Sequence, residues 1–141
     1  MTHQQLDFLA DSVNPVLLGL FLGFCLFTLR NRGGARAFLS RFGLALLITY
    51  VLSHLHQGFH WGKNLGDFPS GHMAFFFTVA TSFFLLEGRS ALFTVPVALL
   101  YGWLIVFLGY HSWIDLLGAL VLAVPVTWFV HRIAGRQAGP E

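Results

Sequence analysis

The chain has 141 residues, of which 56% are hydrophobic and only 10% carry a charge. Soluble domains carry about 25% charged residues, so the composition excludes a soluble globular domain and predicts a membrane protein. The formal net charge is +2, and the basic residues form no continuous patch, so we expect no nucleic-acid partner. The single cysteine, Cys25, excludes an intrachain disulfide.

Five apolar runs predict an all-α, polytopic bundle of about five transmembrane helices. The runs cover residues 15–29, 38–55, 70–86, 92–110 and 113–133. A spanning helix needs about 20 residues and rarely fewer than about 17, so the first and third runs are short. Residues 1–12 contain no Lys or Arg, so they are not a secretory signal peptide, and we expect them to lie at the membrane interface. No linker or internal repeat is found, so residues 1–141 are expected to form a single domain.

The distribution of basic residues predicts the orientation of the bundle. Seven arginines lie in or beside the turns on one side of the predicted membrane: Arg30, Arg32, Arg36, Arg41, Arg89, Arg132 and Arg136. Lys63 is the only basic residue on the other side. Because cytoplasmic loops carry an excess of Lys and Arg, we expect the N-terminus outside, the C-terminus inside, and residues 56–72 and 110–115 on the extracytoplasmic face.

The first motif, Phe-Pro-Ser-Gly-His at residues 68–72, stands at the threshold of the third run. Pro69 suits the start of a helix, and Ser70 and Gly71 leave the first helical amides accessible. An exposed helix N-terminus binds anions because its amide groups lack intrahelical partners. His72 follows directly, so the motif predicts an anion site with an imidazole beside it.

The second motif, His-Ser-Trp-Ile-Asp at residues 111–115, opens the fifth run. His111 and Asp115 are four residues apart, which places them on one face of a helix. A carboxylate there can hold one imidazole nitrogen as a donor and leave the other to attack or accept a proton. An ionisable residue that enters an apolar span is a candidate functional group. Since both motifs return to the same membrane face, they predict phosphate chemistry.

Together the two motifs resemble the type 2 phosphatidic acid phosphatase superfamily. The similarity covers about residues 54–123 and includes Pro-Ser-Gly-His at 69–72, Val-Phe-Leu-Gly-Tyr-His at 106–111 and Asp-Leu-Leu-Gly-Ala at 115–119. It implies a six-helix fold from which this chain lacks the first helix. It also implies that His111 is the nucleophile, forming a phosphohistidine, that Asp115 orients it, and that His72 is the general acid.

The resemblance further implies a membrane lipid-phosphate phosphatase without cofactor or metal. The expected substrate is a lipid phosphate or an isoprenoid (di)phosphate, hydrolysed at the extracytoplasmic face of a bacterial plasma membrane. The family carries an arginine six residues before its second histidine, where this chain has Ile105, and its Lys-x6-Arg-Pro motif has no counterpart before Pro69. We therefore expect other residues to bind the substrate phosphate: Lys63, His60, Ser70 and Gly71.

Three alternatives remain open at this point. Gly66-Asp67-x2-Ser70-Gly71-His72 also resembles the sphingomyelin synthase-type transferases, which pass a phosphoryl-linked headgroup to an alcohol. The chain could instead be a non-catalytic protein that lost the phosphate-binding arginines. A metal site could use five histidines (His54, His56, His60, His72 and His111), although few carboxylates and no thiolates accompany them. Gly19 and Gly23 form a small-xxx-small pair, and a homo-oligomer is possible.

Overall fold

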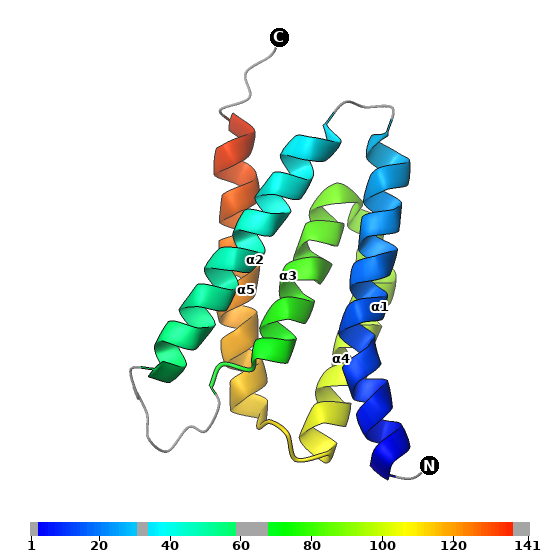
Figure 1. Cartoon of the computed structure of the whole chain (residues 1–141), viewed down its shortest axis with the longest axis vertical. Helices are drawn as coiled ribbons and strands as arrows, with labels where there is room; N and C mark the ends of the chain where they lie inside the picture. Colours follow the sequence, from blue (N-terminus) through cyan, green and yellow to red (C-terminus); the bar gives the residue numbers. More distant parts are fainter. Residues whose placement is uncertain (1–2, 31–33, 59–67, 137–141) are drawn as a thin grey trace.

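The computed structural model describes residues 3–30, 34–58 and 68–136. Within them the chain is a bundle of five α-helices (Figure 1), which confirms the predicted all-α class. The elements in chain order are α1 (His3–Leu29), α2 (Ala35–Gly58), α3 (Gly71–Leu86), the short 3-10 helix η1 (Gly88–Ser90), α4 (Ala91–Phe107) and α5 (Trp113–Arg136). Four described segments are long and apolar enough to cross a membrane: α1, α2, η1 with α4, and α5.

The shortest of the five helices, α3, is the centre of the bundle. It has 16 residues and packs against each of the other four helices (Figure 1). Its buried residues are Met73, Ala74, Phe76, Thr78, Val79, Ser82 and Phe83. Because the other four helices surround α3, its position is fixed by side-chain packing, and it need not be long enough to cross a bilayer. Its N-terminus lies next to residues of the neighbouring helices.

The first helix differs from the prediction. It begins at His3 and contains Pro15, so the predicted boundary at residue 15 is wrong, and the residues before it continue the same helix. Proline has no amide hydrogen, so Pro15 cannot donate to the carbonyl of Asp11 four residues earlier. Membrane helices tolerate such an interruption because neighbouring groups satisfy the released carbonyl.

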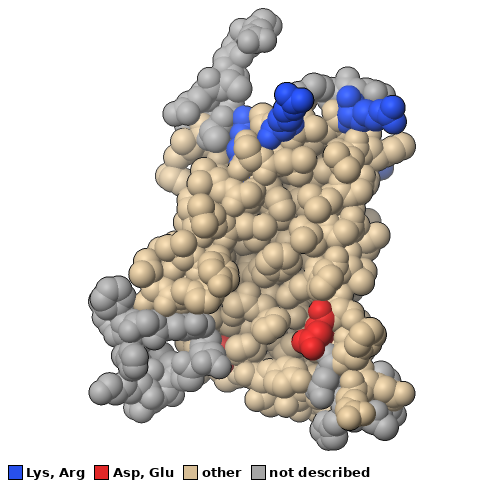
Figure 2. Space-filling model, in the orientation of Figure 1, with Lys and Arg blue, Asp and Glu red and all other residues tan. Residues whose placement is uncertain are grey.

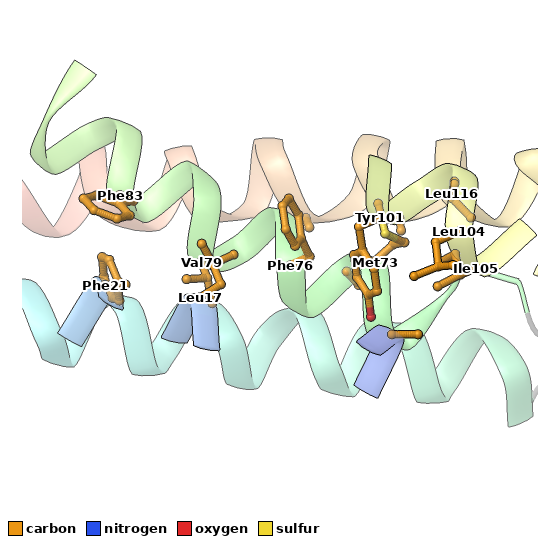
Figure 3. Close-up of a cluster of buried hydrophobic side chains, with 14 of the residues drawn as sticks. Leu17, Phe21, Met73, Phe76, Val79, Phe83, Tyr101, Leu104, Ile105 and Leu116 are labelled. Atoms are coloured by element: carbon orange, nitrogen blue, oxygen red, sulfur yellow. The ribbon is translucent and has the colours of Figure 1, made fainter. Parts of the chain in front are cut away.

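Aromatic side chains pack α1, α2 and α3 together toward one end of the buried core (Figure 3). The fully buried Phe21 of α1 lies with its ring centroid 4.7 Å from that of Phe42 in α2 and 5.7 Å from that of Phe83 in α3. Between membrane helices the hydrophobic effect contributes little, and van der Waals packing and interhelical hydrogen bonds take its place. A buried polar pair supplies one such bond, since the hydroxyl oxygens of Thr49 and Thr78 lie 3.5 Å apart, and the Thr78 hydroxyl donates to the Ala74 carbonyl over 2.9 Å.

The two ends of the bundle differ in charge. Every described arginine side chain lies where α1 ends, α2 begins, η1 turns or α5 ends: Arg30, Arg36, Arg41, Arg89 and Arg132. The described arginine side chains accordingly gather at one end of the face drawn in Figure 2. We call this the arginine end. Both histidine motifs lie at the opposite end, which we call the histidine end. This separation is what the positive-inside rule requires, and the orientation itself stays a prediction.

The glycine pair of α1 makes no close contact with another described helix. Gly19 and Gly23 are exposed, and a Cβ added at either position would meet nothing within 4 Å. The homo-oligomer suggested by this pair therefore stays a prediction.

Candidate active site

The first motif forms the capped start of α3. Ser70 is fully buried and caps the helix, because its Oγ accepts a hydrogen bond from the Met73 amide over 3.3 Å. Its carbonyl accepts a second bond from the Ala74 amide over 2.8 Å. The amides of Gly71 and His72 donate no hydrogen bond within the described chain. Ser70 thus has a structural role, and its predicted contact with phosphate stays a prediction.

The second motif forms a capping box at the start of α5. The amide and hydroxyl of Ser112 both donate to Asp115 Oδ2, over 2.7 and 2.8 Å, and the Asp115 amide donates back to Ser112 Oγ over 3.3 Å. In a capping box the cap residue and the third helical residue bond each other's backbone reciprocally. The role of Ser112 was not predicted from the sequence, although the Ser-x-x-Asp spacing is a helix-start signal.

A backbone hydrogen bond joins the two motifs. The Ser70 amide donates to the Asp115 carbonyl over 3.2 Å, which fixes the start of α3 beside the start of α5. As a result, the ring centroids of His72 and His111 lie 6.2 Å apart. His111 precedes α5 and is not helical, so the argument that it shares a helical face with Asp115 is wrong. The turn before α5 brings the two side chains together instead.

The carboxylate of Asp115 lies close to His111 without bonding it directly. His111 Nδ1 is 3.9 Å from Asp115 Oδ2, longer than a hydrogen bond of about 3 Å. Asp115 Oδ2 is held by Ser112, whereas Oδ1 is buried and accepts no hydrogen bond from the described residues. A buried acceptor without a donor costs free energy. A shift of about 1 Å would bring the imidazole to hydrogen-bond distance of the carboxylate.

Two cavities meet at the histidine pair. Both are lined by Asp11, His72 and His111. The larger has a volume of about 800 Å³ and lies among α1, α2 and α3, where its other lining residues are Asn14, Pro15, Leu18, Tyr50, His54, Gly71 and Phe75. The smaller has a volume of about 320 Å³ and lies between α1 and α4, where it is also lined by Ala10, Tyr101, Ile105 and Tyr110. A molecule in either cavity can therefore reach both imidazoles.

Helix α1 contributes two polar residues that the analysis of the sequence did not select. Asp11 lines both cavities, and Asn14 Nδ2 donates to the His72 carbonyl over 3.2 Å and to the Tyr101 hydroxyl over 3.3 Å. Asn14 thus connects α1 to α3 and α4 at the level of the site. One feature of the sequence could have indicated them, namely that Asp11 and Asn14 are polar residues at the start of an apolar run.

The predicted phosphate ligands are only partly described. Lys63 and His60 lie outside the described residues, as do Gly66 and Asp67. Gly71 lines the larger cavity, and Ile105 lines the smaller one at the position where the family carries an arginine. No lysine or arginine side chain of the described residues lines either cavity.

The histidines proposed for the alternative metal site are not assembled in the described part of the chain. His54 lies on α2, with Nδ1 3.0 Å from the Tyr50 carbonyl and its ring 4.0 Å from the Tyr50 ring. Among the described residues, no three His, Cys, Asp or Glu side chains are arranged to hold a metal ion. His60 lies outside these residues, and so does the side chain of His56.

The fold and the site together define a membrane-embedded helical bundle with two histidines and a carboxylate at one end. The sequence model of the PAP2 superfamily matches residues 50–138, more than half of the chain. The chain therefore belongs to the PAP2 superfamily, which generally comprises phosphatases, and it is a phosphatase-like membrane protein. No curated protein and no solved structure matches the chain. The match includes α3, α4 and α5 and leaves α1 outside.

Proposed function

We propose that the protein is a lipid-phosphate phosphatase that hydrolyses a phosphomonoester or diphosphate at the extracytoplasmic membrane face. The observation that carries this proposal is the pair of imidazoles, 6.2 Å apart between ring centroids, on cavities that they share. Asp115 lies 3.9 Å from one of the two. Membership of the PAP2 superfamily supports the same chemistry.

The first step transfers the phosphoryl group to His111. Its Nδ1 faces Asp115, so Nε2 is the nitrogen that attacks phosphorus while the bond to the leaving oxygen breaks. His72 donates a proton to the departing alkoxide, which is the contribution expected of a general acid. The Asp115 carboxylate stabilises the positive imidazole that the transfer creates.

The second step returns the enzyme to its starting state. Water attacks the phosphorus of the phosphohistidine, and His72, now neutral, accepts a proton from that water. The phosphorus–nitrogen bond breaks, inorganic phosphate leaves, and His111 is regenerated. His72 regains its acidic proton in this step, so the cycle needs no other proton donor.

Charge is the principal difficulty at this site. Asp11 lines both cavities, and its carboxylate opposes the approach of an anionic phosphate. The amides of Gly71 and His72 at the start of α3 offer two donors to a phosphate oxygen. We propose Lys63 and His60 as the additional partners. The larger cavity has an apolar wall of Pro15, Leu18 and Phe75, which suits the first part of a lipid chain.

The proposal is tested by incubating the purified protein in detergent with a panel of lipid phosphates. Release of inorganic phosphate supports hydrolysis. A new lipid product without phosphate release would favour the headgroup transferase, and a folded protein that is silent on every substrate would favour a non-catalytic role. Label from a ³²P-phosphate substrate should be trapped on the wild type and absent from His111→Ala.

The orientation is tested with single cysteines introduced in a Cys25→Ser background. Asn64→Cys should react with an impermeant thiol reagent added outside intact cells, and Asn31→Cys should react only after the membrane is opened. The reason is the excess of arginine beside residue 31. The reverse labelling pattern would contradict the extracytoplasmic site.

A further inference from the structure

A third cavity lies at the arginine end, away from the histidine motifs. Its volume is about 350 Å³, and it lies where the start of α2 meets the ends of α3 and α5. The lining residues are Phe38, Arg41, Leu85, Trp128, His131 and Arg132. Two guanidinium groups and an imidazole therefore face a space that the proposed phosphatase reaction does not use.

Two of the basic side chains of this cavity, Arg132 and His131, are held in place by their neighbours. The Arg132 guanidinium carbon lies 4.6 Å from the centroid of the Trp128 ring, a cation–π contact. His131 is buried, its Nε2 lies 3.3 Å from Ser82 Oγ, and its ring centroid is 4.6 Å from that of Phe38. A ligand in the cavity thus finds Arg132 already ordered, and less conformational entropy is lost on binding.

The positive charge of the cavity is not balanced locally. Among the described residues, neither Arg41 nor Arg132 lies within ion-pair distance of a carboxylate. A guanidinium group presents a planar fork of donors that matches a phosphate group. Two such forks around one cavity favour an anionic oxygen ligand.

The outer surface of the bundle around the mouth of this cavity is apolar. Trp128 is 44% exposed and Leu85 37%, and the neighbouring Phe129 and Ile133 are also exposed. Tryptophan is enriched at the level of the lipid headgroups. A phosphate in this cavity could therefore carry acyl chains that lie along the apolar surface of α5.

We propose that this cavity is a binding site for an anionic phosphate group, with Arg41 and Arg132 as its ligands. The apolar rim favours a phospholipid headgroup as the source of that group over free phosphate. Basic pockets between transmembrane helices bind anionic headgroups by the same charge pairing. The site is separate from the histidine pair, so it stands whether or not the proposed hydrolysis is correct.

The test is lipid binding to the purified full chain, measured by native mass spectrometry. Phosphatidylglycerol should bind at least about tenfold more tightly than phosphatidylcholine of the same chain length, because the choline cation next to the phosphate of the latter is repelled by the two guanidinium groups. The double variant Arg41→Gln/Arg132→Gln should lose this preference. The matched control Arg36→Gln/Arg89→Gln removes the same charge from the same end and should keep it.

Two further measurements distinguish a lipid headgroup from free phosphate and control for misfolding of the double variant. Excess inorganic phosphate that displaces the lipid would identify free phosphate as a ligand of the same site, and failure to displace it would identify the lipid. Arg132→Lys keeps the charge but loses the planar fork, so it should bind phosphatidylglycerol several-fold more weakly even if the double variant does not fold. Equal loss in both double variants, or an unchanged preference in the cavity variants, would overturn the proposal.

Discussion

The two ends of the bundle use the same residue type in different ways. At the histidine end, His72 is exposed and His111 lies beside Asp115, and both line open cavities. At the arginine end, His131 is buried against Ser82 and Phe38. A histidine becomes a candidate for proton or phosphoryl transfer when a carboxylate and a cavity adjoin it. The comparison shows that the surroundings of each imidazole, rather than its presence, distinguish the two ends.

The ends also differ in how their charged groups are held. Hydrogen bonds fix Asp115 in place: its carboxylate accepts from the amide and hydroxyl of Ser112, and its backbone carbonyl accepts from the Ser70 amide. Arg132 is fixed by an aromatic ring. Backbone caps set a side chain within a narrow range of positions, which suits a site where atoms must react. A guanidinium group stacked on a ring keeps its hydrogen-bonding edge available, which suits a site that binds a phosphate group.

The largest expected loss of turnover comes from replacing His72 or His111, and the two replacements should differ in their dependence on the leaving group. His111→Ala should be inactive on a lipid phosphate and on an activated aryl phosphate, because no nucleophile remains. His72→Ala should lose about a hundred- to ten-thousandfold on the lipid phosphate, the usual contribution of a general acid. It should recover in part on the aryl phosphate, whose leaving group departs without a proton. Turnover of both substrates by both variants is the measurement.

The reverse result would remove the assigned roles. If His111→Ala keeps activity while His72→Ala loses it on both substrates, His72 is the nucleophile. Gel filtration of both variants in detergent checks that the bundle has folded.

The next effect concerns Asp115. Asp115→Asn should reduce turnover to a value between those of the wild type and His111→Ala, because an amide stabilises a positive imidazole less well than a carboxylate. Ser112→Ala should instead cost about 1 kcal/mol of stability through the lost cap while the carboxylate stays beside His111. Turnover and thermal unfolding of the two variants distinguish these contributions. Equal turnover in Asp115→Asn and the wild type would make Asp115 a capping residue alone.

A smaller change in turnover is expected at Gly71. A Cβ added there meets no atom of the described residues within 4 Å, so Gly71→Ala should fold. If phosphate binds the first amides of α3, the added methyl group obstructs it, and KM should rise about tenfold, the equivalent of one charged hydrogen bond. Gly43→Ala, also without neighbours within 4 Å, is the control. An unchanged KM would place the phosphate elsewhere.

The packing of the histidine end is tested at Gly118. A Cβ at this position of α5 would collide with the ring of Phe68, which immediately precedes Pro69. Gly118→Ala should therefore cost about 1–3 kcal/mol, as overpacking does, and shift the chain that leads to His72. Gly23→Ala meets no described neighbour within 4 Å, so it should not lower the temperature of thermal unfolding, and the higher helix propensity of alanine favours a small rise. Equal stability of the two variants would show that Phe68 is not tightly held.

The smallest effect is expected at Asn14. Asn14→Ala removes the hydrogen bonds from α1 to the His72 carbonyl and the Tyr101 hydroxyl and should cost about 1 kcal/mol. Ser12→Ala, which loses only a bond to the Phe8 carbonyl one turn earlier in the same helix, is the control. Thermal unfolding measures both. A loss as large in Ser12→Ala would show that α1 is destabilised generally rather than detached from the site.

Much of the architecture could be predicted from the sequence, because its causes are local. Apolar runs separated by arginines predict helices and their alternation, and the Pro-Ser-Gly-His and His-x3-Asp motifs mark two helix starts. These features depend on residues within a few positions of one another. The first apolar run was predicted from residue 15, whereas the helix begins at His3 and continues through Pro15.

The helices that surround the two motifs could not be predicted from the sequence. Asp11 and Asn14 come from α1, far from His72 and His111 in sequence, and no local pattern connects them. His131 and Arg41 likewise meet only because α2 packs against α5. Local sequence patterns were enough to predict five helices, the separation of charge between the two ends, and the two histidines with their carboxylate. The neighbours of each polar group were decided by helix packing, because contacts between distant segments depend on how whole surfaces fit together.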